Sequence, residues 1–341
     1  MEKRRNNKHL AYILFILCVV MFIFTKRNIC PITSLYQSDP GVYHEILQPP
    51  EENVQEGLTD DFFEKLIALH EYKKPPGPDD WLAHHPEPGQ PYADYIKQNH
   101  VKPDAVLKTI YITLLGDFDA SRKQIVEQTA RYIEMYFQMP VQILPSIPLD
   151  VIPDHARRVH PRWKDKQVLS TYVIDQVLAP NKPDDAYCLI AFTSFDLWPG
   201  GNWNFVFGQA SMEDRVGVWS IYRNGDPNKS EQDRKLCLRR TIKTGTHEIG
   251  HMFGLYHCIY FECNMNGSNH RKESDQAPIW LCPVCLKKLH WLHPFDTQER
   301  YQHLLGVSQE YDMTPEVQFY QKSLDFIQQY NESSGEKDSL E

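Results

Sequence analysis

The sequence predicts an α/β (α+β) fold with a mixed, mostly parallel sheet, and three observations carry this prediction. From residue 106 onward, runs rich in β-branched and aromatic residues alternate with segments of helical periodicity. Such alternation requires crossover connections, which favour parallel strands. Two later strand-like runs are separated only by a short polar turn, which suits an antiparallel edge. A content of 41% hydrophobic residues is ample for a core.

The N-terminal region has the layout of a membrane signal. Residues 10–24 carry no charged side chain. Basic residues flank this run on both sides: Lys3, Arg4, Arg5, Lys8, Lys26 and Arg27. An ordinary span needs about 20 apolar residues, but no small-residue cleavage site follows this run. We expect residues 1–30 to form an uncleaved, single-pass type II signal anchor, with the remainder of the chain lumenal or extracellular. A cleaved signal peptide, a buried apolar helix and a cytosolic main domain are the alternatives.

Three further regions follow. Residues 31–105 are rich in proline and polar residues, and we expect a stalk and then an extension packed on the main domain. Trp81 and Tyr92 are the expected packing anchors, and residues 60–70 form one amphipathic segment. The main domain is predicted to span residues 106–320. Residues 321–341 are predicted to hold the end of a helix and a polar tail.

Strands and helices alternate along the first part of the predicted main domain. Strands are expected over residues 106–116, 141–144 and 186–193, and helices over 121–139, 169–178 and 235–254. Ser121 is the expected N-cap of the first helix. The runs 203–211 and 215–223 are the expected antiparallel edge, and residues 208–211 are a candidate for pairing with an extended peptide. An edge strand without a ligand is an equal alternative. Amphipathic helices after residue 290 close the domain.

One motif on the long predicted helix carries chemistry: His247, Glu248, His251, Gly254 and His257 in HEIGHMFGLYH. Residues four apart share one helical face, so the first two imidazoles can bind one zinc ion. Glu248 lies beside the first ligand and suits a general base. Gly254 permits a turn with positive φ, which returns His257 as a third ligand and leaves the fourth position open, as in catalytic zinc sites. A helix with incidental histidines and an inactive zinc-binding descendant are the alternatives.

A second set of ligands begins at the next residue. Cys258, Cys263, Cys282 and Cys285 form two closely spaced pairs, which suit a tetrahedral structural zinc. Pro283 supports the tight turn that such a pair needs. Two disulfides are the alternative. The sequence therefore predicts two zinc ions per chain, one catalytic and one structural.

Other polar residues near the motif are weaker candidates. Glu273 and Asp275 are candidate acceptors for the N–H of a metal-bound imidazole, with solvated carboxylates as the alternative. His270, His290 and His293 are expected to be solvated.

Met265 follows Cys263 by two residues. The elongated histidine motif followed by a methionine resembles the metzincins, and the interposed cysteines resemble the archaemetzincins in particular. The resemblance implies a metzincin-like zincin fold, with the sheet over an active-site helix and a small C-terminal subdomain built on the four-cysteine zinc. It also implies that Met265 forms the floor of the catalytic site.

Motif and resemblance together predict a zinc metallopeptidase, a hydrolase that cleaves peptides or proteins with a zinc-activated water and Glu248 as general base. A zinc-binding scaffolding or interaction protein on a metzincin fold without turnover is the main alternative. A zinc-ribbon interaction module with an incidental histidine cluster is another. A net charge of -9 and a pI of about 5.9 argue against a nucleic-acid partner. No feature of the sequence indicates an oligomeric state.

Overall fold

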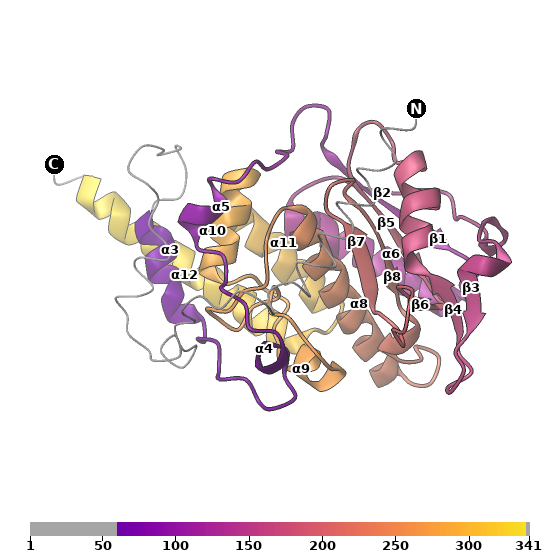
Figure 1. Cartoon of the computed structure of the whole chain (residues 1–341). Helices are drawn as coiled ribbons and strands as arrows, with labels where there is room; N and C mark the ends of the chain where they lie inside the picture. Colours follow the sequence, from indigo (N-terminus) through magenta and orange to yellow (C-terminus); the bar gives the residue numbers. More distant parts are fainter. Residues whose placement is uncertain (1–59, 339–341) are drawn as a thin grey trace, which may run out of the picture. The chain divides into compact units, whose positions relative to one another are not determined.

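The computed structural model describes residues 60–338 (Figure 1). The expected anchor in residues 1–30 and residues 31–59 of the expected stalk and extension lie outside the described residues. The main sheet has the strand order β2-β1-β5-β8-β7. Its strands are β1 (Thr109–Leu115), β2 (Val141–Ile143), β5 (Ala186–Thr193), β7 (Gly208–Ser211) and β8 (Val216–Ser220).

The sheet is parallel except at one edge. β1 pairs in parallel with β2 and β5, and β5 pairs in parallel with β8. β7 runs antiparallel to β8 at the edge. Every residue of β1 and β5 is buried, as expected of parallel strands that are covered on both faces. The predicted mixed, mostly parallel sheet and its antiparallel edge are confirmed.

Helices cover both faces of this sheet. Successive side chains of a strand point to opposite faces, so each buried strand contributes to two cores. Cys188 and Phe192 of β5 join the larger core, which α6 and α8 share. Leu189 between them joins the second core, on the face covered by η6. The helices concerned are α6 (Ala120–Phe137), α8 (Glu231–Met252), α7 (Ser170–Tyr172) and the π-helical η6 (Val173–Leu178).

The predicted N-cap of α6 is wrong by two positions. Asp119 is the N-cap, and its Oδ1 accepts a hydrogen bond from the backbone N–H of Arg122 at 2.8 Å. Ser121 lies in the first turn, where its hydroxyl donates to Oδ1 of Asn228 at 2.6 Å. A carboxylate is the better cap because it accepts a charge-assisted hydrogen bond at the positive end of the helix dipole.

The sequence did not predict a second sheet, with strand order β3-β4-β6. Its strands are β3 (Arg157–Val159), β4 (Lys166–Leu169) and β6 (Asp196–Trp198). These strands have three or four residues each, too few to show a period-two pattern. Two predicted elements differ from the observed ones. Leu169 ends β4 instead of beginning a helix, and the run from Trp203 is a strand only from Gly208.

The described part of the extension packs on the C-terminal helices. α3 contacts α10 and α12, and the ring of Phe62 lies 5.3 Å from that of Tyr330. Tyr92 is buried, as expected of an anchor. The helices of these regions are α3 (Asp60–Leu66), α4 (Trp81–His84), α5 (Tyr92–Tyr95), α9 (Arg271–Gln276), α10 (Pro283–Leu292), α11 (Thr297–Glu310) and α12 (Thr314–Asp338). Short 3-10 helices complete the order: η3 (Ile67–Leu69), η4 (Leu149–Val151), η5 (Asp154–Ala156), η7 (Ala179–Asn181) and η8 (Tyr222–Asn224).

The predicted assignment as a transmembrane, membrane-anchored protein is corrected here. Across residues 60–338, each helix is either too short or too polar to cross a bilayer. The apolar run of residues 10–24, on which the assignment rested, lies outside the described residues.

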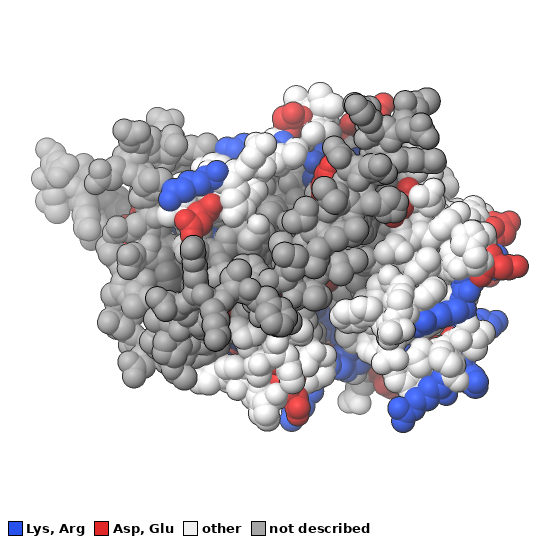
Figure 2. Space-filling view, in the orientation of Figure 1, with Lys and Arg blue, Asp and Glu red and all other residues white. Residues whose placement is uncertain are grey.

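Charged side chains of both signs share the face drawn in Figure 2, around the end that carries β3 and β4. Arg157 of β3 forms an ion pair with Asp154 at 3.5 Å, and the Asp154 side chain is fully exposed. Exposed pairs of this kind contribute roughly 0–1 kcal/mol each. The fold therefore depends on its buried contacts.

We expect Asp119→Ala to lower the free energy of unfolding by about 1 kcal/mol, because the first turn of α6 loses its cap. Ser121→Ala is the matched control and is expected to change it by less than about 0.5 kcal/mol. Thermal unfolding of the zinc-loaded protein measures both. A larger loss in the Ser121 variant than in the Asp119 variant would contradict the assignment of the cap.

Candidate active site

The histidine motif lies at the C-terminal end of α8. His247 and His251 are one turn apart, with ring centroids 4.7 Å from each other. Beyond the end of the helix, Gly254 adopts φ +79°, and the chain returns so that the ring of His257 lies 5.0 Å from that of His251. The ligand atoms of the three imidazoles lie within 4.8 Å of one another. The structure therefore brings the three predicted histidines together.

Hydrogen bonds fix the tautomers of the two helical histidines. Nδ1 of His247 lies 2.7 Å from the carbonyl oxygen of Asn264, and Nδ1 of His251 lies 2.6 Å from that of Leu255. A carbonyl oxygen only accepts, so each Nδ1 carries the proton and each Nε2 has a free lone pair. Burial lowers the pKa of each of the two imidazoles to about 3. Both rings are therefore neutral, as metal binding requires.

The third histidine is held by a carboxylate from the extension, which the sequence analysis did not find. Nδ1 of His257 donates to Oε1 of Glu87 at 2.8 Å, and Nε1 of Trp81 donates to the same oxygen at 2.9 Å. Burial opposes ionisation of Glu87, but the hydrogen bond from His257 lowers the pKa of this carboxyl below its usual value. The indole of Trp81 also packs edge-on against His257, at 5.2 Å between centroids. The extension thus contributes directly to the site.

Glu248 lies on the same turn as His247. Burial raises the pKa of its carboxyl above the usual range. Among the described residues Glu248 accepts no hydrogen bond, so its carboxylate remains available to a water molecule beside the imidazoles.

The loop after α8 folds back beneath the helix. The backbone N–H of Cys258 donates to the carbonyl oxygen of Met265 at 2.7 Å. Met265 is fully buried, and a Cβ on Gly250 of α8 would come within 2.5 Å of its sulfur. Only glycine at position 250 allows this close approach of the methionine to the helix.

The four predicted cysteines form a second cluster. Cys258, Cys263, Cys282 and Cys285 are buried, and their sulfur atoms lie within 4.8 Å of one another. Sγ of Cys258 and Sγ of Cys282 are 3.6 Å apart, well beyond a disulfide bond of about 2.05 Å, and all four thiols are free. None of the four thiols is therefore in a disulfide, and together they could hold one metal ion.

Glu273 and Asp275 do not reach the histidines. The carboxylate of Glu273 accepts hydrogen bonds from the backbone N–H of Trp81 and of Asn269. Asp275 forms an ion pair with Arg240 at 2.6 Å. Their predicted role toward a histidine of the motif is therefore wrong, and the carboxylate that accepts a hydrogen bond from one of these histidines is Glu87.

The three histidines that were expected to be solvated make contacts within the protein. His270 caps α9 through Nδ1, and its Nε2 lies 3.3 Å from Oδ1 of Asp80. His290 packs edge-on against Phe295, and Nε2 of His293 lies 3.1 Å from the carbonyl oxygen of Gln138. His290 and His293 are half-buried, so the expectation that they are solvated holds only in part.

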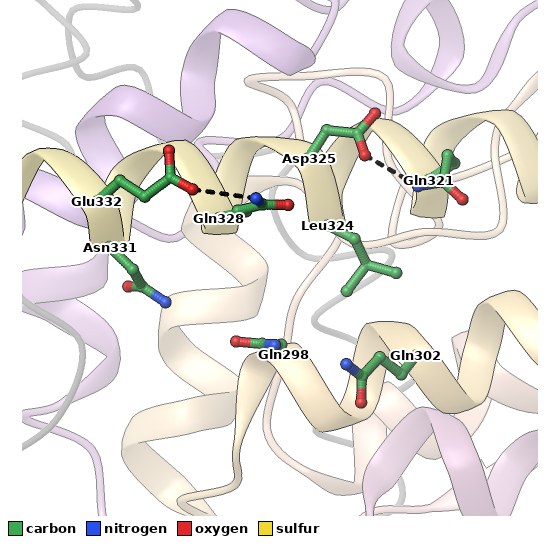
Figure 3. A pocket seen from close by; sticks show the side chains of 8 residues that line it. All are labelled: Gln298, Gln302, Gln321, Leu324, Asp325, Gln328, Asn331 and Glu332. Carbon is green, nitrogen blue, oxygen red and sulfur yellow. Dashed lines mark hydrogen bonds between the residues drawn. The ribbon is translucent and has the colours of Figure 1, made fainter.

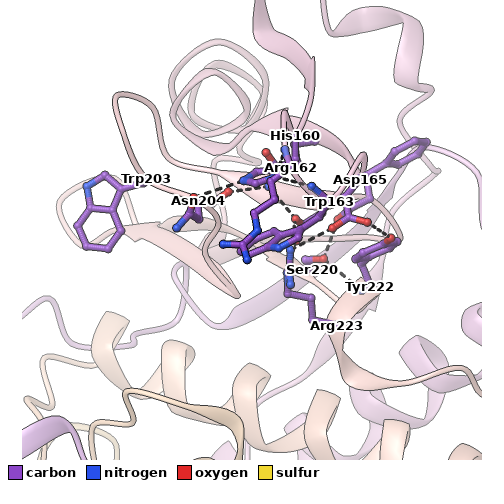
Figure 4. A network of polar contacts seen from close by, with 12 residues as sticks. His160, Arg162, Trp163, Asp165, Trp203, Asn204, Ser220, Tyr222 and Arg223 are labelled. Carbon is purple, nitrogen blue, oxygen red and sulfur yellow. Dashed lines mark hydrogen bonds and ion pairs between the residues drawn. The ribbon is translucent and has the colours of Figure 1, made fainter. Parts of the chain in front are cut away.

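A polar network holds the loop that leads into β7 (Figure 4). Arg158 donates to the backbone oxygens of Trp203 and Asn204 at 2.9 and 3.1 Å. Arg223 pairs with Asp196 at 2.7 Å. The side chain of Trp203 is left 64% exposed at the tip of this loop. The network therefore fixes the position of the edge strand, which packs against α8.

A surface groove of about 370 Å³ lies elsewhere, between α11 and α12 (Figure 3). Carboxamide side chains dominate its lining, which consists of Gln298, Gln302, Gln321, Leu324, Asp325, Gln328, Asn331 and Glu332. It contains none of the histidines or cysteines of the two clusters, so it is not the active site.

Comparisons with known proteins found similar sequences and structures. The sequence model of the family described as Peptidase family M54 matches residues 187–291. Archaemetzincin-2 from Homo sapiens is 33% identical over 270 residues, which cover 70% of this chain and 73% of the relative. Archaemetzincin-2 from Pongo abelii has the same identity and coverage. The crystal structure of archaemetzincin from Methanopyrus kandleri is 26% identical and has a TM-score of 0.45, covering 55% of this chain and 97% of the other.

An identity of 33% over most of both chains is ample to assign a family, and the clusters of histidines and cysteines lie within the region that the family model matches. The chain belongs to the archaemetzincins and is a zinc metallopeptidase, whose substrates are peptides or proteins.

Proposed function

We propose that His247, His251 and His257 hold the catalytic zinc ion and that Glu248 is the general base. One observation carries this proposal: each of the three Nδ1 atoms lies within hydrogen-bonding distance of an oxygen acceptor, which leaves three Nε2 atoms for a common ligand. Three imidazole nitrogens with one open position are a typical donor set for catalytic zinc.

The chain's own groups supply the proton transfers. Zinc, when bound, polarises the scissile carbonyl and lowers the pKa of a bound water to about 7. Glu248 accepts the proton of the attacking water and returns it to the leaving nitrogen. Burial raises the pKa of Glu248, and a pKa closer to neutrality suits a group that both takes and gives a proton.

We also propose a structural zinc ion at Cys258, Cys263, Cys282 and Cys285. Four buried sulfurs provide a closed tetrahedral set without a position for substrate. The two zinc ions then share one short loop, because His257 and Cys258 are adjacent in the chain.

The outer edge of β7 is the proposed site for the substrate backbone. Gly208 to Ser211 pair with β8 on one side only among the described strands. A peptide in extended conformation would add to the free edge as a further strand, beside the helix that carries Glu248.

Glu248→Ala is expected to reduce cleavage of a mixed peptide library by roughly 10²- to 10⁴-fold, because the proton acceptor is lost. Zinc content should not change, since Glu248 is not a ligand. Mass spectrometry of the products measures cleavage, and Glu127→Ala on the exposed surface of α6 is the matched control. Equal cleavage by the Glu248 variant and the wild type would contradict the assignment.

Elemental analysis is expected to find two zinc ions per chain in the wild type and one in His257→Ala, which keeps the cysteine set. A protein that used only its cysteines, such as a zinc-ribbon module, would hold one zinc in both. That result would rule out the proposed histidine site.

Cys258→Ser is expected to lower peptidase activity as well as stability, because the backbone that carries Cys258 also directs His257. Cys237→Ser, a buried thiol on α8 outside the cluster, is the matched control and should remain active. A Cys258 variant with normal activity and two zinc ions would show that the two sites are independent.

A further inference from the structure

The three histidines of the active site do not have equivalent partners. His247 and His251 donate to backbone carbonyl oxygens 17 and 4 residues away in the chain. His257 donates to a carboxylate 170 residues away, on Glu87. One ligand of the three is therefore oriented by a charged side chain from a distant segment.

The hydrogen bonds to Glu87 meet at a single atom. Oε1 accepts from both Nδ1 of His257 and Nε1 of Trp81. The Glu87 and His257 side chains retain only 26% and 21% of their exposed area, so water competes weakly for the bond. Two donors at one oxygen fix the carboxylate, and the carboxylate in turn fixes the imidazole plane.

The segment that carries Glu87 is anchored on its N-terminal side. The backbone N–H of Trp81 donates to both carboxylate oxygens of Glu273, at 3.0 and 3.1 Å. Nδ2 of Asn269 donates to the carbonyl oxygen of Asp79 at 2.9 Å. These bonds attach the extension to α9 and to the residues just before it.

It is also anchored on its C-terminal side, by Gln90. Nε2 of Gln90 donates to the carbonyl oxygen of Gly254 at 3.0 Å, and its Oε1 accepts from the backbone N–H of Tyr256 at 3.2 Å. Both contacts lie within three residues of His257. Glu87 is thus held between two anchors, one of which is the turn that presents the third histidine.

We propose that Glu87 is a positioning residue for the third zinc ligand, so that retention of the catalytic zinc depends on the N-terminal extension. This inference rests on the proposed function, since it takes His257 as a ligand. A carboxylate acceptor on Nδ1 orients the ring and raises the basicity of Nε2. It also places one negative charge beside a centre of three neutral imidazoles and a dication.

Competition with a chelator at constant pH tests the proposal. It measures the dissociation constant of the zinc ion that His257→Ala removes. Glu87→Ala removes acceptor and charge and is expected to weaken zinc binding by about 10- to 100-fold. Glu87→Gln keeps an oxygen that can accept both hydrogen bonds and removes only the charge, so a smaller loss is expected. Trp81→Phe keeps a ring and removes one donor, and should fall between the wild type and Glu87→Ala.

Glu71→Gln is the matched control, because Glu71 is a largely exposed carboxylate of the same extension whose ion pair is with Lys74, not with a residue of either cluster. Its zinc affinity should equal that of the wild type. The zinc of the four-cysteine site should remain in every variant, and circular dichroism should be unchanged, which separates a local effect from misfolding.

Two negative results have different meanings. If the wild type has no zinc ion that His257→Ala removes, the proposed histidine site itself fails. If that zinc is present and Glu87→Ala binds it as tightly as the wild type, only the role of Glu87 is refuted. A misfolded Glu87→Ala leaves Glu87→Gln and Trp81→Phe to decide, and wild-type affinity in both would overturn the proposal.

Discussion

The active site depends on one backbone constraint: α8 must end within a turn of His251, and the chain must double back. Gly254 makes this possible, because its φ of +79° lies in a region that residues with a Cβ rarely adopt. The reversal is held by the bond from the N–H of Leu255 to the carbonyl of Gly250, at 3.1 Å. The carbonyl of Leu255 then orients His251. One turn therefore places the third histidine and also fixes the second.

The loop beyond the turn links the two clusters. Asn264 orients His247 through its carbonyl oxygen, while Met265 packs against Gly250 and accepts from the N–H of Cys258. The cysteine cluster closes this loop at both ends, through Cys258 and Cys263. A metal at the cysteines would thus hold the base of the histidine site by covalent connection and by hydrogen bonds. Loss of a metal at the cysteines would therefore also disturb the positions of the histidines.

Local patterns in the sequence predict much of this arrangement, and long-range contacts account for what they miss. The strands β1 and β5 are predominantly apolar runs, and the spacing of His247, His251 and His257 follows from helix geometry and one glycine. Strands of three or four residues, such as β3, have no periodicity to detect. Glu87 lies in a proline-rich segment with no motif of its own, and only the folded chain brings it to His257. Glu273 was the wrong choice because proximity in sequence is a poor guide to which carboxylate meets an imidazole.

The bond between Glu87 and His257 closes a loop of 170 residues, and all five strands of the main sheet lie within it. The entropy lost on closing a flexible loop grows with the logarithm of its length, so these ends meet only after the intervening chain has become compact. His247 and His251, by contrast, approach each other as soon as one helical turn forms. We therefore expect the bond between Glu87 and His257 to form late in folding. In a chain that has not yet formed its main sheet, His257 would lack its carboxylate acceptor.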